Sequence, residues 1–323
     1  MSKIAVELGG GESIPVVDFT GLSAGDLPLR RATALSMREA FEDFGFIYVK
    51  KHGVSQSVVD ELFAQGIAFF NLSQAAKAQA GGYRGAGLSG LDPTKPTDVK
   101  ERFRAPYDGD LPAGYWPERP LKFRESISVF HEAGLFVLRQ VMHGVALSLG
   151  LREDYFDAAH EPHSGAVMLL HYPPITEPLL PGQLRSGAHT DFGTMTLLFH
   201  HGSAEGLEIQ RLDGTWLHAP SIPGAAIVNV GDLLTRWTNG LLRSVLHRVV
   251  PPEGEAGQRS RYSATLFYEP RHEVVISCLG PCQSLTKPPL YPPITVGERL
   301  EQRRRENMPV VMKTKLDCHD GGL

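Results

Sequence analysis

The second half of the chain is a series of short apolar runs separated by glycine and proline, and this pattern limits the possible folds. The runs span residues 167–172, 195–199, 207–210, 225–230, 245–250, 262–268 and 274–277. Many short strands at fairly even spacing are typical of a β-sandwich or β-barrel and not of a parallel sheet. We therefore expect a mainly β fold.

The first half has a different pattern, in which strands alternate with helices. Residues 14–19 and 46–49 read as strands, and 29–44 and 57–72 as amphipathic helices, the second with Ser57 as its N-cap. A long irregular stretch covers 79–115, a core helix covers 122–149 and a charged helix covers 296–307. We predict an N-terminal α/β segment over 1–120, followed by a catalytic domain over 121–323.

Three residues in the β region have the side chains of a metal site. His189 and Asp191 lie two positions apart, so an extended chain points both to one side. His247 alternates with Val245 and Val249, which predicts an imidazole that faces the interior. With 13 histidines in the chain, about one His-x-Asp pair is expected by chance. The alternative for each histidine is a hydrogen-bonded core or surface residue.

The chemistry of this set favours iron. Two imidazoles and one carboxylate form the facial triad of non-haem Fe(II) oxygenases, which leaves adjacent coordination positions free for a 2-oxo acid and for dioxygen. The set contains no thiolate, which argues against structural zinc. We predict His189, Asp191 and His247 as ligands of Fe(II).

Arg261 and Ser263 repeat the two-residue spacing farther along the chain. A guanidinium binds a carboxylate through two hydrogen bonds, and the serine hydroxyl can add a third. An internal salt bridge to an acid is the alternative use of this arginine.

Several motifs together resemble the isopenicillin N synthase-like family of Fe(II)- and 2-oxoglutarate-dependent dioxygenases. They are IPVVDF, FGFIYVKKHGV, HTDFGTMTLLFHH, IVNVGDLLTRWTNGLLRSVLHRVV and RYSATLFYEP, spread over residues 14–270. The resemblance implies a double-stranded β-helix (jelly-roll) core with flanking helices. It also implies iron ligation by His189, Asp191 and His247, and binding of the distal carboxylate of 2-oxoglutarate by Arg261, Ser263 and Tyr172.

The activity implied by the resemblance is oxidation of a small organic substrate in specialised metabolism, with 2-oxoglutarate and O2 converted to succinate and CO2. Hydroxylation is the default outcome, and desaturation or ring formation are variants. Some relatives oxidise without 2-oxoglutarate, which stays an alternative. Leu170 stands where many members have an asparagine near the iron-proximal carboxylate, and His171 is then expected to point towards substrate.

Substrate contacts and supporting residues are further expectations. We expect side chains from loops and strand ends to line the entrance to the substrate site. One of the arginines could hold an acidic substrate. The candidates are Tyr83, Arg84, Phe103, Arg104, Tyr107, His171, Arg185, Trp237 and Phe267. His200 and His201 are placed at the solvent end of their strand. Turn and hydrogen-bonding residues that fix the strand of His247 are Asn229, Asp232, Asn239 and Gly240.

Composition excludes several classes of partner. The net charge is −4 with the signs mixed, so nucleic acid is not expected. No run approaches the length of a membrane span, and the N-terminus lacks a signal-peptide core. The three cysteines form no CxxC motif, which fits a reducing cytoplasm. We expect a cytoplasmic monomer that acts on a small molecule. A non-catalytic β-sandwich binding protein and a zinc hydrolase are the other classes left open.

Overall fold

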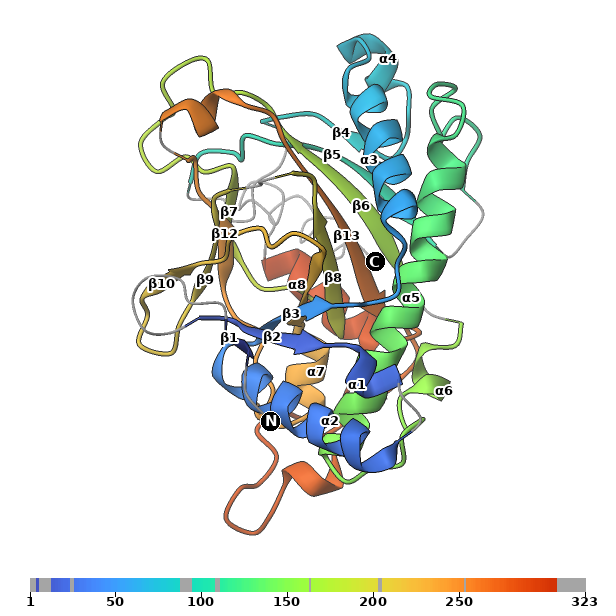
Figure 1. Ribbon diagram of the computed structural model, residues 1–323, viewed down its shortest axis with the longest axis vertical. Coiled ribbons are helices and arrows are strands. Elements are labelled where there is room, and N and C mark those ends of the chain that lie inside the picture. Colours follow the sequence, from blue (N-terminus) through green and yellow to red (C-terminus); the bar gives the residue numbers. More distant parts are fainter. Residues whose placement is uncertain are drawn as a thin grey trace, which may run out of the picture.

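The computed structural model describes residues 4–5, 13–23, 26–87, 95–107, 111–162, 164–202, 205–252 and 254–306. Over these residues, two β-sheets face each other, and helices cover the outer face of the larger one (Figure 1). In spatial order the larger sheet runs β1 (Ile4–Ala5), β2 (Pro15–Asp18), β3 (Phe46–Lys50), β11 (Ala225–Val230), β8 (Met195–His200), β13 (Arg261–Glu269), β6 (Ser164–Tyr172), β5 (Glu101–Pro106) and β4 (Tyr83–Arg84).

The smaller sheet supplies the opposite wall of the core. Its order is β10 (Trp216–His218), β9 (Leu207–Gln210), β12 (His247–Val249) and β7 (Ser186–His189). A separate antiparallel pair joins β14 (Val275–Ile276) to β15 (Ile294–Thr295). All pairings within the smaller sheet are antiparallel, as expected for a jelly roll. The mainly β core with flanking helices, expected from the sequence, is confirmed.

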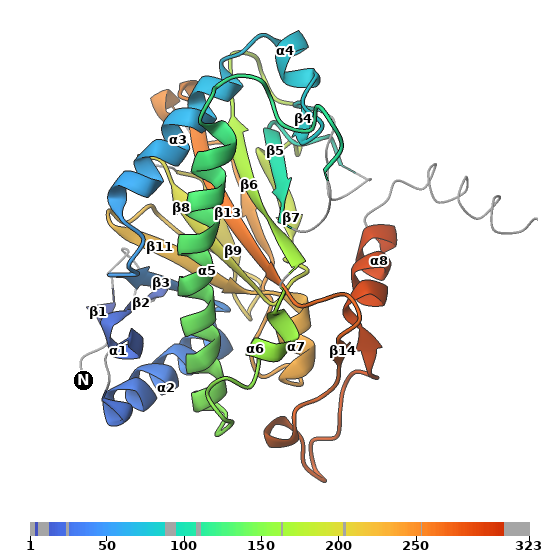
Figure 2. The same cartoon turned by 90° about the vertical axis from the view of Figure 1, so that its right-hand side faces the viewer.

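Most helices pack on one face of the larger sheet, so that the layers run helix, large sheet, small sheet, whereas α8 (Val296–Glu306) lies on the other side of the sheets from the long helix α5 (Phe123–Ser148) (Figures 1 and 2). The helices are α1 (Thr20–Ser23), α2 (Leu27–Asp43), α3 (Gln56–Phe70), α4 (Gln74–Ala78), α5 (Phe123–Ser148), α6 (Asp157–His160), α7 (Asp232–Trp237) and α8 (Val296–Glu306). Short 3-10 turns span Gly254–Gln258 and Gly280–Cys282. None of the described helices combines the length and the apolarity that crossing a bilayer requires.

The long helix α5 is the main support of the large sheet. Its buried residues recur every three or four positions, for example Val137, Leu138 and Val141, so one face of the helix is apolar. Gly134 lets this face approach the sheet closely, because a Cβ there would lie 2.7 Å from the Leu266 side chain. Gly150 has a φ of 71°, a left-handed conformation that ends the helix without strain.

Strand alternation divides the large sheet into two environments. On β13, Ala264 and Leu266 point to the helices and belong to the main core. Phe267, on the opposite face, packs against a second apolar cluster between the two sheets, which includes Met168 and Val249. The second cluster lines the space between the sheets, where the functional residues of β13, β6 and β8 also point.

The N-terminal segment is hydrogen-bonded into the larger sheet. Its strands β1, β2 and β3 extend one edge, while β4 and β5 extend the other. The division into segments 1–120 and 121–323 stays a prediction. One local expectation is wrong: the N-cap of α3 is Ser55, which accepts a hydrogen bond from the Val58 amide, and not Ser57.

Candidate functional site

Three side chains converge between the two sheets, at one end of the smaller sheet. His189 ends β7, Asp191 follows in the next turn, and His247 begins β12. Because His247 pairs directly with His189 across the antiparallel ladder, their ring centroids lie 4.2 Å apart. One candidate ligand atom from each of the three residues lies within 4.8 Å of the others. The sequence prediction that these residues form a cluster is therefore reproduced by the geometry.

The backbone fixes the tautomer of both imidazoles. Nδ1 of His189 lies 2.8 Å from the carbonyl oxygen of Gly187, and Nδ1 of His247 lies 3.1 Å from that of Val245. A carbonyl oxygen can only accept, so each Nδ1 carries the hydrogen. In the neutral ring Nε2 is therefore the atom with the free lone pair, and both Nε2 atoms face Asp191 Oδ1, at 3.9 and 3.7 Å.

The carboxylate of Asp191 is held through its other oxygen. Oδ2 accepts hydrogen bonds from the Thr196 hydroxyl and from Asn229 Nδ2, the latter at 2.7 Å. Thr196 on β8 and Asn229 on β11 are direct cross-strand partners, so the sheet presents them as a pair. Asn229 was expected to fix the strand of His247, and the structure corrects this. Thr196 was not singled out, because only strand pairing reveals it.

The electrostatic environment sets the protonation of His189 and Asp191 in the form that binds a cation. Burial and the neighbouring His247 hold the pKa of His189 well below its usual value, so the imidazole is neutral at neutral pH. Burial alone would raise the pKa of Asp191, but the two imidazoles and the two hydrogen bonds outweigh it and lower the pKa. A neutral His189 and an ionised Asp191 need lose no proton to bind a metal.

A buried arginine on β13 lies on the same inner side of the large sheet. Arg261 is 4% exposed, and its guanidinium sits 4.6 Å from the Tyr172 ring centroid and 3.5 Å from the Ser263 hydroxyl. Within the described ranges it forms no ion pair with an acid, and its Nε has no hydrogen-bond partner there. The alternative of an internal salt bridge is thus not found in that part of the chain. A buried cation without a counter-ion fits a site for an external carboxylate.

His200 lies next to Arg261 and was misplaced by the sequence prediction. It lies on the inner face of β8, where its Nε2 accepts a hydrogen bond of 3.1 Å from Arg261. Burial lowers the pKa of His200 well below its usual value, and Arg261 adds to this effect, so the ring is a neutral acceptor. His201, the next residue, is exposed as expected.

Helix α8 braces the turn that carries Asp191. Arg299 binds both carboxylate oxygens of Asp232, at 2.6 and 3.0 Å, and the Asp232 amide donates to the Asp191 carbonyl. Arg303 donates to the Thr190 hydroxyl at 2.7 Å and lies 4.8 Å from the Phe192 ring centroid. The C-terminal helix thus touches the residues on either side of this candidate ligand.

Several expected substrate contacts lie on the wrong side of the large sheet. Tyr83, Phe103 and His171 are at strand positions that face the helices: Phe103 packs against Phe69 and Phe123, and His171 bonds Glu101 at 2.7 Å. The alternation of the strands corrects the expectation for these three. Trp237 is buried in the helix-side core. Tyr107 is 52% exposed and stacks on His131 of α5.

Other candidates do face the space between the sheets. Arg104, Arg84 and Phe267 share this face, together with Leu170, whose aliphatic side chain is 8% exposed. Arg102 was not predicted, yet it is the direct cross-strand neighbour of Leu170. The guanidinium of Arg185 is almost fully buried, and its NH2 donates to the carbonyls of Pro173, Gly257 and Arg259. Its contacts therefore tie loops together.

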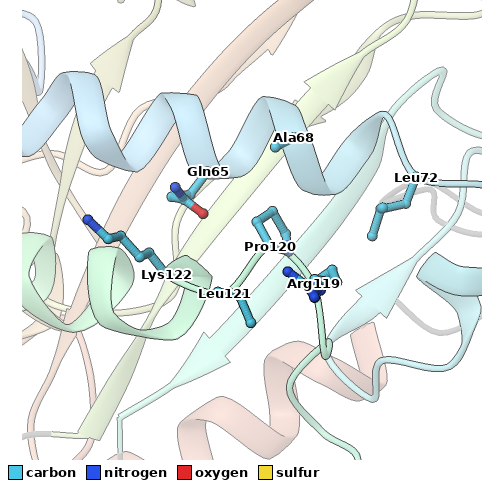
Figure 3. A pocket seen from close by; sticks show the side chains of 7 residues that line it. All are labelled: Gln65, Ala68, Leu72, Arg119, Pro120, Leu121 and Lys122. Atoms are coloured by element: carbon cyan, nitrogen blue, oxygen red, sulfur yellow. The ribbon is translucent and has the colours of Figure 1, made fainter.

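A surface hollow elsewhere is unrelated to this cluster. It lies between α3 and the segment that precedes α5 and is lined by Gln65, Ala68, Leu72, Arg119, Pro120, Leu121 and Lys122 (Figure 3). These residues belong to the helical side, and the hollow has few polar groups. It has none of the candidate ligand residues.

Comparison with known proteins gives matches that extend over most of the chain. The model of the 2OG-Fe(II) oxygenase superfamily matches residues 164–270, and that of the N-terminal region of the non-haem dioxygenases in morphine synthesis matches residues 14–124. Azadirone synthase of Melia azedarach is 30% identical, over 91% of this chain and 94% of its own. Homoarginine-6-hydroxylase of Glycine max is 29% identical, over 83% and 88%.

Solved structures agree with these matches. A full-length protein of Neurospora crassa, crystallised with alpha-ketoglutarate (2-oxoglutarate), superimposes with a TM-score of 0.85 at 30% identity, covering 94% of this chain and 99% of that one. The same protein with thymine bound gives a TM-score of 0.84. By its sequence identity and its jelly-roll core with a His–Asp–His cluster, the chain belongs to the 2-oxoglutarate–Fe(II) oxygenase superfamily, whose members are enzymes that use Fe(II), 2-oxoglutarate and O2.

Proposed function

We propose that His189, Asp191 and His247 hold the Fe(II), and that Arg261, Ser263 and Tyr172 bind the distal carboxylate of 2-oxoglutarate. The proposal rests on two groups of side chains in the space between the two sheets. One is a set of three ligand atoms within 4.8 Å, and the other is a buried guanidinium that lacks an acid in the described residues. The donor types fit Fe(II) and a dicarboxylate.

The roles of the residues follow from their hydrogen bonds. Gly187 and Val245 orient the two imidazoles through their carbonyls, and Thr196 and Asn229 orient Asp191. Arg261 and Ser263 would bind one end of the co-substrate and so orient it in the space that the candidate metal ligands share. The bound metal supplies the activation of O2. The apolar lining of the interior limits the access of water to the substrate.

We infer that the enzyme hydroxylates a small polar molecule in specialised metabolism. Support comes from two similar proteins, one named as a homoarginine hydroxylase and the other crystallised with thymine. We also propose a cytoplasmic monomer made of the two segments described above. The free thiols of Cys278 and Cys282 support a reducing compartment.

One kinetic experiment tests both assignments. Purified protein is supplied with Fe(II), and O2-dependent conversion of 2-oxoglutarate to succinate is measured. We expect Asp191→Ala to abolish conversion, because two imidazoles alone leave the metal without its anionic ligand. We expect Arg261→Ala to raise the KM for 2-oxoglutarate about tenfold or more, because it removes a charge-assisted pair.

The control is Asp60→Ala, an exposed acid of α3 that bonds Gln56, which should leave both constants unchanged. Full turnover in Asp191→Ala would refute the ligand assignment. An unchanged KM in Arg261→Ala would refute the co-substrate assignment alone.

A further inference from the structure

Three arginines gather on β4 and β5, at the edge of the large sheet. Arg84 pairs with Arg102 across these strands, Arg102 pairs with Leu170 on β6, and Arg104 pairs with Met168. Leu170 and Met168 belong to the apolar cluster between the two sheets. Since directly paired residues share a face, all three arginines point to the side that holds the candidate metal ligands.

These arginines have no acidic partner among the described residues. Arg102 approaches Met168 Sδ at 3.9 Å, and its buried Nε has no hydrogen-bond partner in those residues. Arg84 donates to the carbonyls of Gly81 and Tyr83. Over the part of the chain that the structure describes, no ion pair links any of the three to a carboxylate. The neighbouring acid, Asp98, is engaged by Lys100 at 2.9 Å and by the Gly187 amide.

Such a cluster is unfavourable when nothing neutralises it. Burial lowers the pKa of Arg102 and the charges of Arg104 and Arg84 lower it further, while Asp98 acts weakly in the opposite direction. The guanidinium nevertheless stays charged at any physiological pH, so the repulsion persists in the folded protein. An anion bound between these arginines would relieve the repulsion and satisfy the orphaned Nε of Arg102.

This anion is distinct from the distal carboxylate of 2-oxoglutarate. Arg102, Leu170 and Ser263 form one row across β5, β6 and β13. Two strand spacings, or about 10 Å, therefore separate the backbones of Arg102 and Ser263. The three arginines lie beside Met168 and face the space between the two sheets. The substrate has to approach the metal through this space.

We propose that the substrate of this enzyme is an organic oxyanion, a carboxylate or a phosphate ester, and that Arg102 binds its acidic group with help from Arg104. The inference rests on the proposed function, because it places the substrate beside the His189–Asp191–His247 cluster. Among the similar proteins, homoarginine carries a carboxylate whereas thymine carries no ionised group at neutral pH. The arginine cluster favours a substrate of the first kind.

The test measures binding without turnover. Wild-type protein, Arg102→Gln and Arg102→Lys are loaded with Fe(II) and saturating 2-oxoglutarate under nitrogen, so that the Arg261 site is filled. Acid probes are titrated against their neutral analogues: 3-phenylpropanoate and hexanoate against the primary amides, and phenyl phosphate against phenol. The readout is the rise in Tm, from which a Kd follows. Arg31→Gln, an exposed arginine of α2, is the control.

We expect at least one acid to stabilise the wild type and Arg31→Gln more than its neutral analogue does. The carboxylate and phosphate arms show which oxyanion is preferred. Arg102→Gln should weaken the Kd for that acid about tenfold or more, with partial recovery in Arg102→Lys.

Three results would overturn the inference: no preference for any acid in the wild type, an unchanged Kd for the acid in Arg102→Gln, or a Kd for 2-oxoglutarate, from the same rise in Tm, that is weaker in Arg102→Gln. Failure of the proposed function is separate, since it would show as no succinate formation by the wild type.

Discussion

At the scale of single residues, the candidate metal centre depends on hydrogen bonds that leave the ligand atoms free. Each imidazole donates its Nδ1 hydrogen to a carbonyl two residues earlier. One oxygen of Asp191 accepts hydrogen bonds from Thr196 and Asn229. The other lone pairs then point to a common centre. The orientation of Asp191 thus depends on side chains of two other strands.

Asn229→Ala should therefore weaken iron binding more than catalysis. We expect the Fe(II) concentration for half-maximal activity to rise about 10- to 100-fold, because Asp191 loses a bond that orients it. At saturating Fe(II), kcat should stay close to that of the wild type. Measuring succinate formation against Fe(II) concentration separates the two effects. Asn71→Ala, at the exposed end of α3, serves as control. An unaltered iron requirement would contradict the positioning role.

The sequence predicted these residues unevenly. His189, Asp191 and His247 could be found because short spacing and strand alternation locate them. The role of Asn229 and the presence of Thr196 and Arg102 depend on which strands become neighbours, and no local pattern reports that. His200 was misplaced because its polarity suggested solvent, although its partner is a buried arginine. Membership of the enzyme family excludes the binding-protein alternative.

At the scale of elements, helix α8 holds the segment around Asp191 in place. Its Arg299 and Arg303 bind Asp232 and Thr190 respectively, and both of these lie beside the candidate ligand in space or in sequence. The helix is highly charged, so its sequence alone suggested a solvated face. The structure shows that two of these charged residues, Arg299 and Arg303, contact residues next to the candidate metal ligand Asp191.

Arg303→Ala should loosen this turn. We expect faster loss of Fe(II) to a chelator, by a few-fold, and a smaller effect on the KM for 2-oxoglutarate, because Arg261 is on another strand. The control is Arg304→Ala on the same helix, whose side chain is 58% exposed and pairs only weakly with Glu301 at 3.8 Å. Equal rates of iron loss in the two variants would show that the Thr190 contact does not matter.

Element prediction succeeded where apolar periodicity was strong. The long helix, predicted over 122–149, is observed as Phe123–Ser148, and two strands match at both ends. The strands that were missed include β4, β5, β7 and β10. The apolar–polar alternation expected of a strand is hidden in β5, because the buried residue Glu101 is charged. Its carboxylate is stabilised by ion pairs and not by apolar contacts. β7 is only Ser186–His189 and contains glycine, so no propensity marks it.

At the scale of the whole molecule, one buried polar network joins the N-terminal segment to the core. Glu101 on β5 bonds Lys77 of α4 at 2.7 Å, His171 of β6 at 2.7 Å and the Tyr83 hydroxyl of β4. Burial would raise the pKa of Glu101, but the bonds from His171, Lys77 and Tyr83 outweigh it and lower the pKa to about 2. The charged form is therefore favoured by folding.

Glu101→Gln should lower the free energy of unfolding by about 3–5 kcal/mol, because Lys77 would be left buried without a counter-ion. In the wild type, the stabilisation from Glu101 should be complete above its ordinary pKa near 4.5 and be lost as pH falls towards 2. Urea unfolding of the metal-free protein at several pH values measures both effects.

Glu301→Gln, at an exposed pair on α8, is the matched control. A stability curve for Glu101→Gln parallel to that of the wild type over this acidic range would contradict the linkage.

The interior face of β6 is buried along its whole length, whereas the matching positions of β5, which are Arg102, Arg104 and Pro106, are all partly exposed. Among the described contacts, neither Arg102 nor Arg104 touches a residue that orients His189, Asp191 or His247. Natural selection can therefore exchange these two side chains and change which molecule is oxidised, while the machinery for oxygen chemistry is inherited intact. For the same reason, a protein engineer who wants a new substrate specificity should begin with Arg102 and Arg104.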